Sequence, residues 1–218
     1  MTFSIVARCE RTGQCGVAGA TAMIAVGKLA SHAAPLHGAI ATQAELNPYI
    51  GYDGLRLLAR CLDADEVLRQ VLADDPDPEV RQVGVVDGNG RTAAWTGSRT
   101  LPWAGHAFGR GFSVQGNRLA GPEVLEAVIE SMHGSEHLPL AERLLLAIEA
   151  GDALGGDRLG ERSSNIFVVD REEYPLWDIR VDDHDHPIRE LRRLFHLFGE
   201  KLLPEIEKMP KRATAPRK

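Results

Sequence analysis

Residues 81–96 read RQVGVVDGNGRTAAWT, and this stretch decides the fold class. Two apolar runs, 81–86 and 92–96, flank Asp87-Gly88-Asn89-Gly90, and Asp-Gly and Asn-Gly pairs are among the strongest local signals for a β-hairpin. A hairpin joins antiparallel neighbours, whereas parallel neighbours need a long crossover connection. The stretch therefore favours antiparallel sheets and disfavours the parallel sheet of dinucleotide-binding proteins.

The first forty residues repeat this pattern. The segment TFSIVAR (2–8) alternates as a half-buried strand does, and a Thr-Gly turn leads to a second apolar run, CGVAGATAMIAV (15–26). A third short run, GAIATQ (38–43), precedes NPYIGYDG (47–54). The Asn-Pro and Asp-Gly pairs of that segment predict an ordered loop.

Helical signals follow each group of strands. Helices are predicted over 54–61, from Asp63 with Glu66 as a capping box, from Pro122 to about Met132, from Pro139 to Glu149, and from Pro187 towards Lys208. Further strands are predicted at 111–117, after a Gly/Trp/Pro loop, and at 163–169 and 177–181. This order indicates a single α+β domain over residues 1–208, with two sheets sandwiched by helices.

Composition narrows the class of function. The 218 residues carry a net charge of −6, and because residues 208–218 hold five basic and no acidic side chains, the rest has 20 basic against 31 acidic. An acidic body disfavours nucleic acid, and the tail 209–218 is expected to be disordered. The start lacks the layout of a secretory signal, so we expect a cytoplasmic protein that does not bind a membrane. Three cysteines make no disulfide framework or zinc pattern, and GGDRLG (155–160) is no phosphate loop.

Several segments carry a family resemblance. They are MTFSIVAR, ATQAELNPYIGYDGLRLL, VRQVGVVDGNGRTAAWTGS, PWAGH, VQGNRLAGPEV, AERLLLAIEAGDALGGDRLGE and RVDDH. In this order they resemble the bacterial family of domain of unknown function 1028 (DUF1028), grouped with the N-terminal-nucleophile (Ntn) hydrolases. The resemblance implies a four-layer αββα sandwich of two mainly antiparallel sheets, and Ntn relatives suggest a possible homodimer. No cofactor is expected.

The resemblance also implies a mechanism centred on Thr2. In Ntn hydrolases the first residue of the mature chain attacks an amide carbonyl, and its own α-amine is the base. A free α-amine has a pKa of about 7.7–8.0 and is suited to activate a neighbouring hydroxyl near neutral pH. Thr2 meets this requirement once Met1 is removed. We therefore expect an amidohydrolase acting on a small amide, imide or ureido bond.

Other polar residues are candidates for supporting roles. Asn117, at a predicted strand end, could donate to the developing oxyanion, and Asp157 could orient the amine. The expected substrate-binding residues lie at loops and strand ends; they are Gln43, Asn47, Tyr49, Trp103, His106 and Ser164. Each also has a structural interpretation as a turn, cap or packing residue.

Two alternatives remain open. The first is a catalytically silent Ntn-like protein that binds a ligand or assembles with partners and retains Met1. The second is a metal-dependent enzyme, because strand alternation would place Asp182, His184 and His186 on one face. Pro187 follows at once, however, so these acidic residues also suit the N-terminus of the final helix, and no metal site is predicted.

Overall fold

The computed structural model describes residues 2–156 and 159–212 and contains two antiparallel sheets. In the six-stranded sheet the order is β10-β9-β2-β1-β8-β7, and in the four-stranded sheet it is β3-β4-β5-β6. The strands of the first sheet are β1 (Thr2–Arg8), β2 (Cys15–Thr21), β7 (Gly105–Gly109), β8 (Phe112–Asn117), β9 (Ser163–Val169) and β10 (Trp177–Val181). Those of the second are β3 (Ser31–Ala34), β4 (Gly38–Ala44), β5 (Arg81–Asp87) and β6 (Thr92–Thr96).

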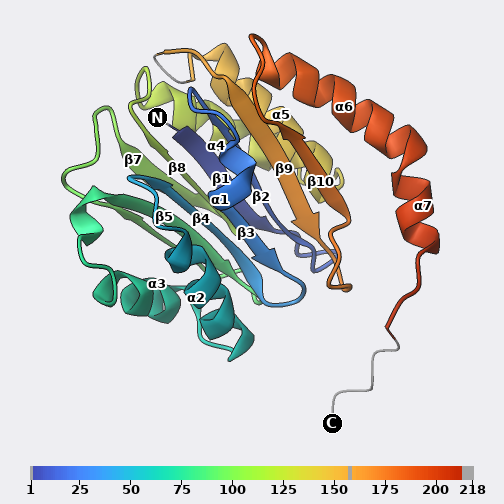
Figure 1. Cartoon of the computed structure of the whole chain (residues 1–218), viewed down its shortest axis with the longest axis horizontal. Coiled ribbons are helices and arrows are strands. Elements are labelled where there is room, and N and C mark those ends of the chain that lie inside the picture. Colours follow the sequence, from blue (N-terminus) through green and yellow to red (C-terminus); the bar gives the residue numbers. More distant parts are fainter. Residues whose placement is uncertain (1, 157–158, 213–218) are drawn as a thin grey trace.

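The two sheets pack face to face, and helices cover both outer faces (Figure 1). The smaller sheet is covered by α2 (Pro48–Ala59) and α3 (Ala64–Ala73), and the larger by α4 (Glu123–Gly134), α5 (Leu140–Ala153) and α6 (Pro187–Lys201). Shorter helices are α1 (Val26–Leu29), α7 (Leu203–Lys208) and a 3-10 turn at Pro78–Val80. The predicted αββα sandwich of antiparallel sheets is confirmed. No helix in the described ranges is both long and apolar enough to cross a bilayer.

Strand alternation divides the buried side chains among three layers. Phe3, Ile5 and Ala7 of β1 point to α4 and α5, in the largest apolar cluster. A second cluster lies between the smaller sheet and its helices. Between the sheets, Val6 packs with Val17 of β2, and this third cluster fills only the end of the interface near the β1–β2 turn. The other end of that interface is polar.

The prediction of a loop over 47–54 is wrong, because α2 begins at Pro48. Asn47 caps the helix through its side chain, which accepts a hydrogen bond from the amide of Tyr49 at 3.1 Å. The glycines serve close packing instead of turns. A Cβ on Gly51 would lie 2.1 Å from Cδ2 of His32, and one on Gly54 would lie 2.4 Å from Cδ1 of Ile40. The helix can therefore lie directly on the sheet.

Three other predicted boundaries need correction. The strand expected over 15–26 ends at Thr21, and α1 and β3 follow it. The Gly/Trp/Pro loop contains the edge strand β7. This strand was not predicted from the sequence because it begins and ends with glycine and none of its residues is fully buried. The final helix divides into α6 and α7 because Pro204, which has no N–H, cannot continue α6.

Candidate functional site

Six polar side chains lie buried between the sheets at the end where β1 begins. They are Ser4, Gln43, Gln82, Ser113, Gln115 and Asn117, and none is more than 4% exposed. A buried polar group without a partner costs about 1–3 kcal/mol, so such a cluster is stable only when its members bind one another. Each of these side chains does have hydrogen-bond partners.

Gln43 links the two sheets at Thr2. Its Nε2 donates to the carbonyl oxygen of Thr2 at 3.3 Å and to Oε1 of Gln82 at 2.7 Å. Its Oε1 accepts from the hydroxyl of Ser4 at 2.7 Å. The backbone of the first residue of β1 is thus held from the opposite sheet.

Gln82 links the two sheets at Asn117 as Gln43 does at Thr2. Gln43 and Gln82 are cross-strand partners in the smaller sheet, and Thr2 and Asn117 are cross-strand partners in the larger one. Oε1 of Gln82 accepts from Nδ2 of Asn117 at 3.0 Å, and Nε2 of Gln82 donates to the carbonyl oxygen of Gly116 at 2.8 Å. The two glutamines therefore hold two neighbouring residues of the facing sheet in a fixed relation.

Gln115 closes the network on the inner side. Its Nε2 donates to Oγ of Ser4 at 2.6 Å, and its Oε1 accepts from the hydroxyl of Ser113 at 3.1 Å. The side chain lies over Gly84, where an added Cβ would be 2.2 Å from Oε1 of Gln115. Glycine at position 84 leaves the space that this amide occupies.

The hydroxyl of Thr2 faces the same intersheet space. It donates to Oγ1 of Thr21 at 3.1 Å, and Thr2 is 8% exposed. Thr21 ends β2 directly beside the start of β1, and its carbonyl oxygen accepts from the amide of Arg162 at 2.7 Å. Two hydroxyls therefore meet at the rim of the sandwich, next to Asn117 on the other neighbouring strand.

His106 joins the network from the edge strand β7. Its Nδ1 lies 2.8 Å from Oγ1 of Thr96, which also accepts from Nε2 of Gln82 at 3.0 Å. The imidazole remains exposed on one side, and its partial burial lowers its pKa. Of the predicted site residues, Thr2, Gln43, Asn117 and His106 thus belong to one connected network.

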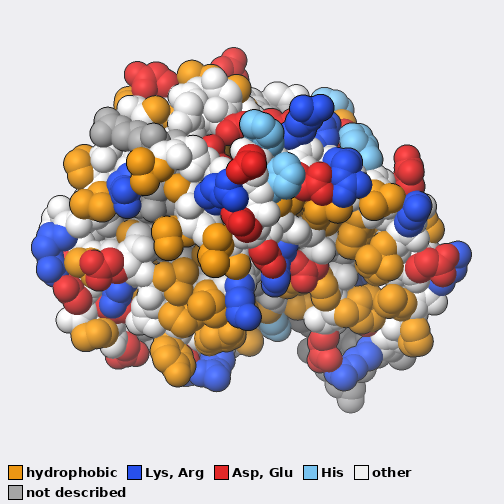
Figure 2. All heavy atoms as spheres, turned by 45° about the horizontal axis from the view of Figure 1, so that its top comes forward, with side chains coloured by type: hydrophobic (Ala, Val, Ile, Leu, Met, Phe, Trp, Pro, Cys, Tyr) orange, Lys and Arg blue, Asp and Glu red, His pale blue; other side chains and the backbone are white. Residues whose placement is uncertain are grey.

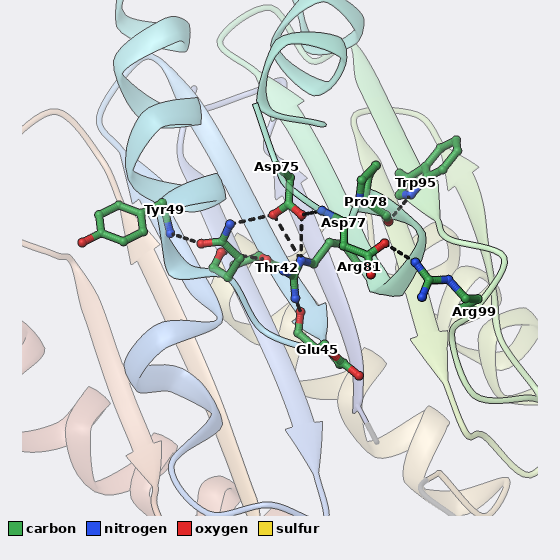
Figure 3. Close-up of polar contacts among 10 residues, drawn as sticks. Thr42, Glu45, Tyr49, Asp75, Asp77, Pro78, Arg81, Trp95 and Arg99 are labelled. Carbon is green, nitrogen blue, oxygen red and sulfur yellow. Dashed lines mark hydrogen bonds and ion pairs between the residues drawn. The ribbon is translucent and has the colours of Figure 1, made fainter. Parts of the chain in front are cut away.

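Asn47 and Tyr49 lie elsewhere. Thr42 points away from the intersheet space, and its hydroxyl donates to the carbonyl oxygen of Asn47 at 3.3 Å on the helix side of the smaller sheet. Nδ2 of Asn47 donates to Asp75, whose carboxylate also accepts from Nε of Arg81 at 3.1 Å (Figure 3). Tyr49 is 68% exposed and its ring points away from this cluster (Figure 3). The structure therefore does not bring either residue to Thr2.

Trp103 and Ser164 also lie apart from the polar network around Thr2. The ring of Trp103 covers Gly105 and packs against the main core, while its carbonyl oxygen accepts from the amide of Leu119 at 3.0 Å. The hydroxyl of Ser164 donates to the carbonyl oxygen of Pro187 at 3.1 Å, on the helix side of β9. Asp157 lies outside the described residues.

The segment 182–186 lies at the same end of the molecule as the start of β1 (Figure 1). Acidic, basic and histidine side chains gather on this face (Figure 2). Asp183 and Asp185 pair with Arg162, Asp182 pairs with Arg180, and Nδ1 of His184 accepts from the amide of residue 186. Within residues 2–156 and 159–212, no group of three or more potential ligands could hold a metal ion.

Six members of the network were not predicted from the sequence: Ser4, Thr21, Gln82, Thr96, Ser113 and Gln115. A signal for three of them was present, since Ser4, Gln82 and Gln115 are polar residues inside otherwise apolar strands. Period-two alternation places Ser4 on the same face as Thr2. Only the packing of one sheet on the other brings these side chains together.

The family model of DUF1028, a family of unknown function, matches residues 2–191. The chain belongs to the DUF1028 family. The crystal structure of the DUF1028 protein SPO2555 from Silicibacter pomeroyi is 28% identical to this chain, with a TM-score of 0.86, covering 94% of this chain and 92% of that one. The two proteins thus share one fold over almost their whole length.

Two other comparisons add nothing on function. Anbu (ancestral beta-subunit) from Yersinia bercovieri is 16% identical with a TM-score of 0.39, covering 97% of this chain and 99% of that one, and similarity at this level supports no conclusion. No match was found among the curated proteins.

Proposed function

We propose that this DUF1028 protein is an Ntn-type amidohydrolase that cleaves a small amide, imide or ureido C–N bond, with Thr2 as nucleophile after removal of Met1. The observation that carries the proposal is the position of Thr2. It begins a central strand of the larger sheet, and its hydroxyl faces the space between the sheets at their rim. A rigid sheet is a suitable support for a nucleophile that must be held to within about 0.5 Å.

The chemistry needs only the first residue and a few donors. The free α-amine of Thr2 takes the proton of the hydroxyl, Oγ1 bonds to the substrate carbonyl carbon, and the C–N bond breaks as the leaving nitrogen takes that proton. Water then cleaves the resulting ester, with the same amine as base, and releases the acid. Both half-reactions pass through an oxyanion that needs hydrogen-bond donors.

The buried network supplies the support that this chemistry requires. Gln43 holds the carbonyl oxygen of Thr2, which limits the movement of the nucleophile. Asn117 is the cross-strand neighbour of Thr2, and one N–H of its side-chain amide donates to Gln82. The same Nδ2 carries a second N–H. We assign that second N–H to the oxyanion. His106 is linked to the same amide through Thr96 and Gln82 and lies at the edge where a substrate could approach.

The first test is the intact mass of protein expressed in a bacterial cytoplasm without an N-terminal tag. The proposal expects a chain lighter by one methionine residue, because the α-amine of Thr2 must be free. A chain that keeps Met1 would rule out this mechanism and leave the alternative, a catalytically silent protein that binds a ligand at the same rim.

The second test uses a β-lactone probe on the processed protein. Attack by Oγ1 opens the lactone ring and forms an ester, so the adduct carries the full mass of the probe. We expect one adduct at Thr2, none in Thr2→Ala, and retention in Thr2→Ser. Thr12→Ala, in the turn at the opposite end of β1, is the matched control and should label as the unmodified protein does. Equal labelling of the Thr2→Ala protein would contradict the proposal.

A further inference from the structure

A cavity lies at the end of the sandwich opposite Thr2. The β1–β2, β5–β6 and β7–β8 turns surround it together with α5, and its volume is about 250 Å³. Four arginines and two glutamates line it: Arg8, Arg11, Arg110, Arg143, Glu10 and Glu136. The excess of arginine is unusual because the body of the protein is acidic.

Arg143 is the decisive member of this lining. It is only 5% exposed, and its Nη2 donates to the carbonyl oxygen of Met132 at 3.1 Å. Its Nε is fully buried and has no hydrogen-bond partner among the described residues. Burial lowers the pKa of its guanidinium. Cys9 and Glu136, which line the same cavity, favour the charged guanidinium but do not outweigh its burial. A buried charge that is only partly compensated is destabilising, so this group is suited to a further negatively charged partner.

The other three arginines of the lining differ in whether they already form ion pairs or hydrogen bonds within the protein. Arg110 pairs with Glu10 at 2.7 Å, and Nη2 of Arg11 donates to the carbonyl oxygens of residues 137 and 138. Neither Arg8 nor Arg143 forms an ion pair with any described residue. Two guanidinium groups that line one cavity therefore remain available to an anion.

The turn beside the cavity also favours negative charge. Burial by itself would raise the pKa of the Cys9 thiol, which lines the cavity. Hydrogen bonds from the hydroxyl and amide of Thr12 and from the amide of Arg11, together with the Arg11 charge, outweigh burial and lower that pKa. Of these groups Arg11 also lines the cavity, and its charge would stabilise an anion that enters from solvent.

We propose that this cavity binds a small molecule through a carboxylate or phosphate group, with Arg143 as the buried recognition residue and Arg8 as its partner. The planar guanidinium presents paired N–H donors that match both groups, and a buried charged hydrogen bond of this kind is strong. Because the cavity lies at the far end of β1 from Thr2, it is separate from the proposed hydrolase site.

The test is calorimetric titration of the full chain with inorganic phosphate and, in a separate arm, with succinate. Chloride keeps the ionic strength constant. We expect saturable binding at one site per chain in at least one arm, and the stronger arm identifies the anion class. Arg143→Lys keeps the positive charge but loses the paired N–H donors of the guanidinium, and Arg8→Gln removes the second guanidinium. Each should weaken binding by roughly tenfold or more.

Arg69→Gln is the matched control. Arg69 is an exposed arginine on α3, away from the cavity, and its removal changes the net charge as Arg8→Gln does. It should leave the dissociation constant unchanged. Circular dichroism verifies that each variant is folded. If Arg143→Lys does not fold, the comparison of Arg8→Gln with the unmodified protein still tests the proposal. The absence of saturable binding in both arms, or equal affinity in the Arg8→Gln and Arg69→Gln proteins, would overturn the proposal.

Discussion

Gln43 of β4 donates a hydrogen bond of 3.3 Å to the carbonyl oxygen of Thr2, so the first residue of one sheet is held by a side chain of the other. Hydrogen bonds between packed sheets are made by side chains, because the backbone groups of each strand already pair within their own sheet. Glutamine is long enough to span the distance. Gln43 also binds Ser4 and Gln82, so this contact is part of a connected network.

Gln43→Leu should destabilise the protein strongly. Leucine has a similar volume, but it leaves the hydroxyl of Ser4 and the carbonyl oxygen of Thr2 without this partner. We expect a loss of about 1–3 kcal/mol for each buried group left unpaired, measured by urea denaturation. Gln70→Leu on α3, which removes an amide bonded to a surface glutamate, should change stability by no more than about 0.5 kcal/mol. Similar losses in the two variants would contradict the importance of the network.

Gly84→Ala should perturb the same network by a steric route. An added Cβ would lie 2.2 Å from Oε1 of Gln115, and that amide is held by Ser4 and Ser113. We expect a loss of about 1–3 kcal/mol in thermal or urea unfolding, as for overpacked cores. At Gly134, where no atom lies within 4 Å of an added Cβ, alanine should be neutral or stabilising by up to about 1 kcal/mol. The two glycine variants should thus differ in sign or clearly in size.

Asn117→Ala should reduce the rate at which Thr2 forms an adduct with the β-lactone probe. If the second N–H of Asn117 stabilises the oxyanion, its loss should slow labelling by about 10²–10³-fold, a range typical of oxyanion donors. Asn89→Ala, in the exposed β5–β6 turn, provides the control and should label at the normal rate. Because Asn117 also donates to Gln82, the fraction of folded protein must be measured in parallel. An unchanged labelling rate in folded Asn117→Ala protein would remove Asn117 from the mechanism.

Asp75→Ala should be among the most destabilising substitutions on the helix side of the smaller sheet. The carboxylate of Asp75 is fully buried and accepts from Asn47, Arg81 and the amide of Asp77. Removing it leaves Arg81, whose side chain is 14% exposed, without its counter-charge, which typically costs about 3–5 kcal/mol. The exposed pair of Asp53 and Arg56 is the comparison, and Asp53→Ala should cost less than about 1 kcal/mol in the same urea titration.

The pH dependence of stability should report on His32. This imidazole is 6% exposed, and burial, which outweighs its hydrogen bond to the carbonyl oxygen of Leu29, lowers its pKa. The unfolded chain therefore takes up a proton at a higher pH than the folded protein does. The neutral His32 imidazole therefore contributes fully to the free energy of unfolding above the ordinary histidine pKa. This contribution is lost as the pH falls from about 6.5 towards the lowered pKa of His32 in the folded protein.

The measurement compares urea unfolding at pH 7.5 and pH 5.5. His32→Gln should show a smaller loss of stability on acidification than the unmodified protein, because the buried imidazole is gone. His196→Gln, which removes an exposed imidazole from α6, should behave as the unmodified protein does. If His32→Gln and the unmodified protein lose equal stability, protonation of His32 does not contribute.

Much of the fold could be predicted because its signals are local. The Asp87–Gly90 turn, the Asp63 cap of α3 and the prolines at the starts of α4, α5 and α6 act within a few residues. The predictions from sequence were wrong where long-range packing, and not local conformation, explains why a residue is present. Gly51 and Gly54 are typical of a loop in sequence, yet they allow α2 to approach His32 and Ile40. Pro204 divided the last helix, and β7 was hidden in a loop of mixed composition.

The sequence by itself determined that this chain forms antiparallel hairpins flanked by helices, that it belongs with DUF1028, and that Thr2 begins a strand. Those properties depend on turns, alternation and residue order along the chain. Only the tertiary structure decided which polar residues accompany Thr2, because Gln43, Gln82 and Asn117 meet through the packing of two sheets. It also placed Asn47 at the N-cap of α2, on the helix side of the smaller sheet. It turned Ser164 away from Thr2, since adjacent strand positions point to opposite faces and no local signal states which face meets the other sheet.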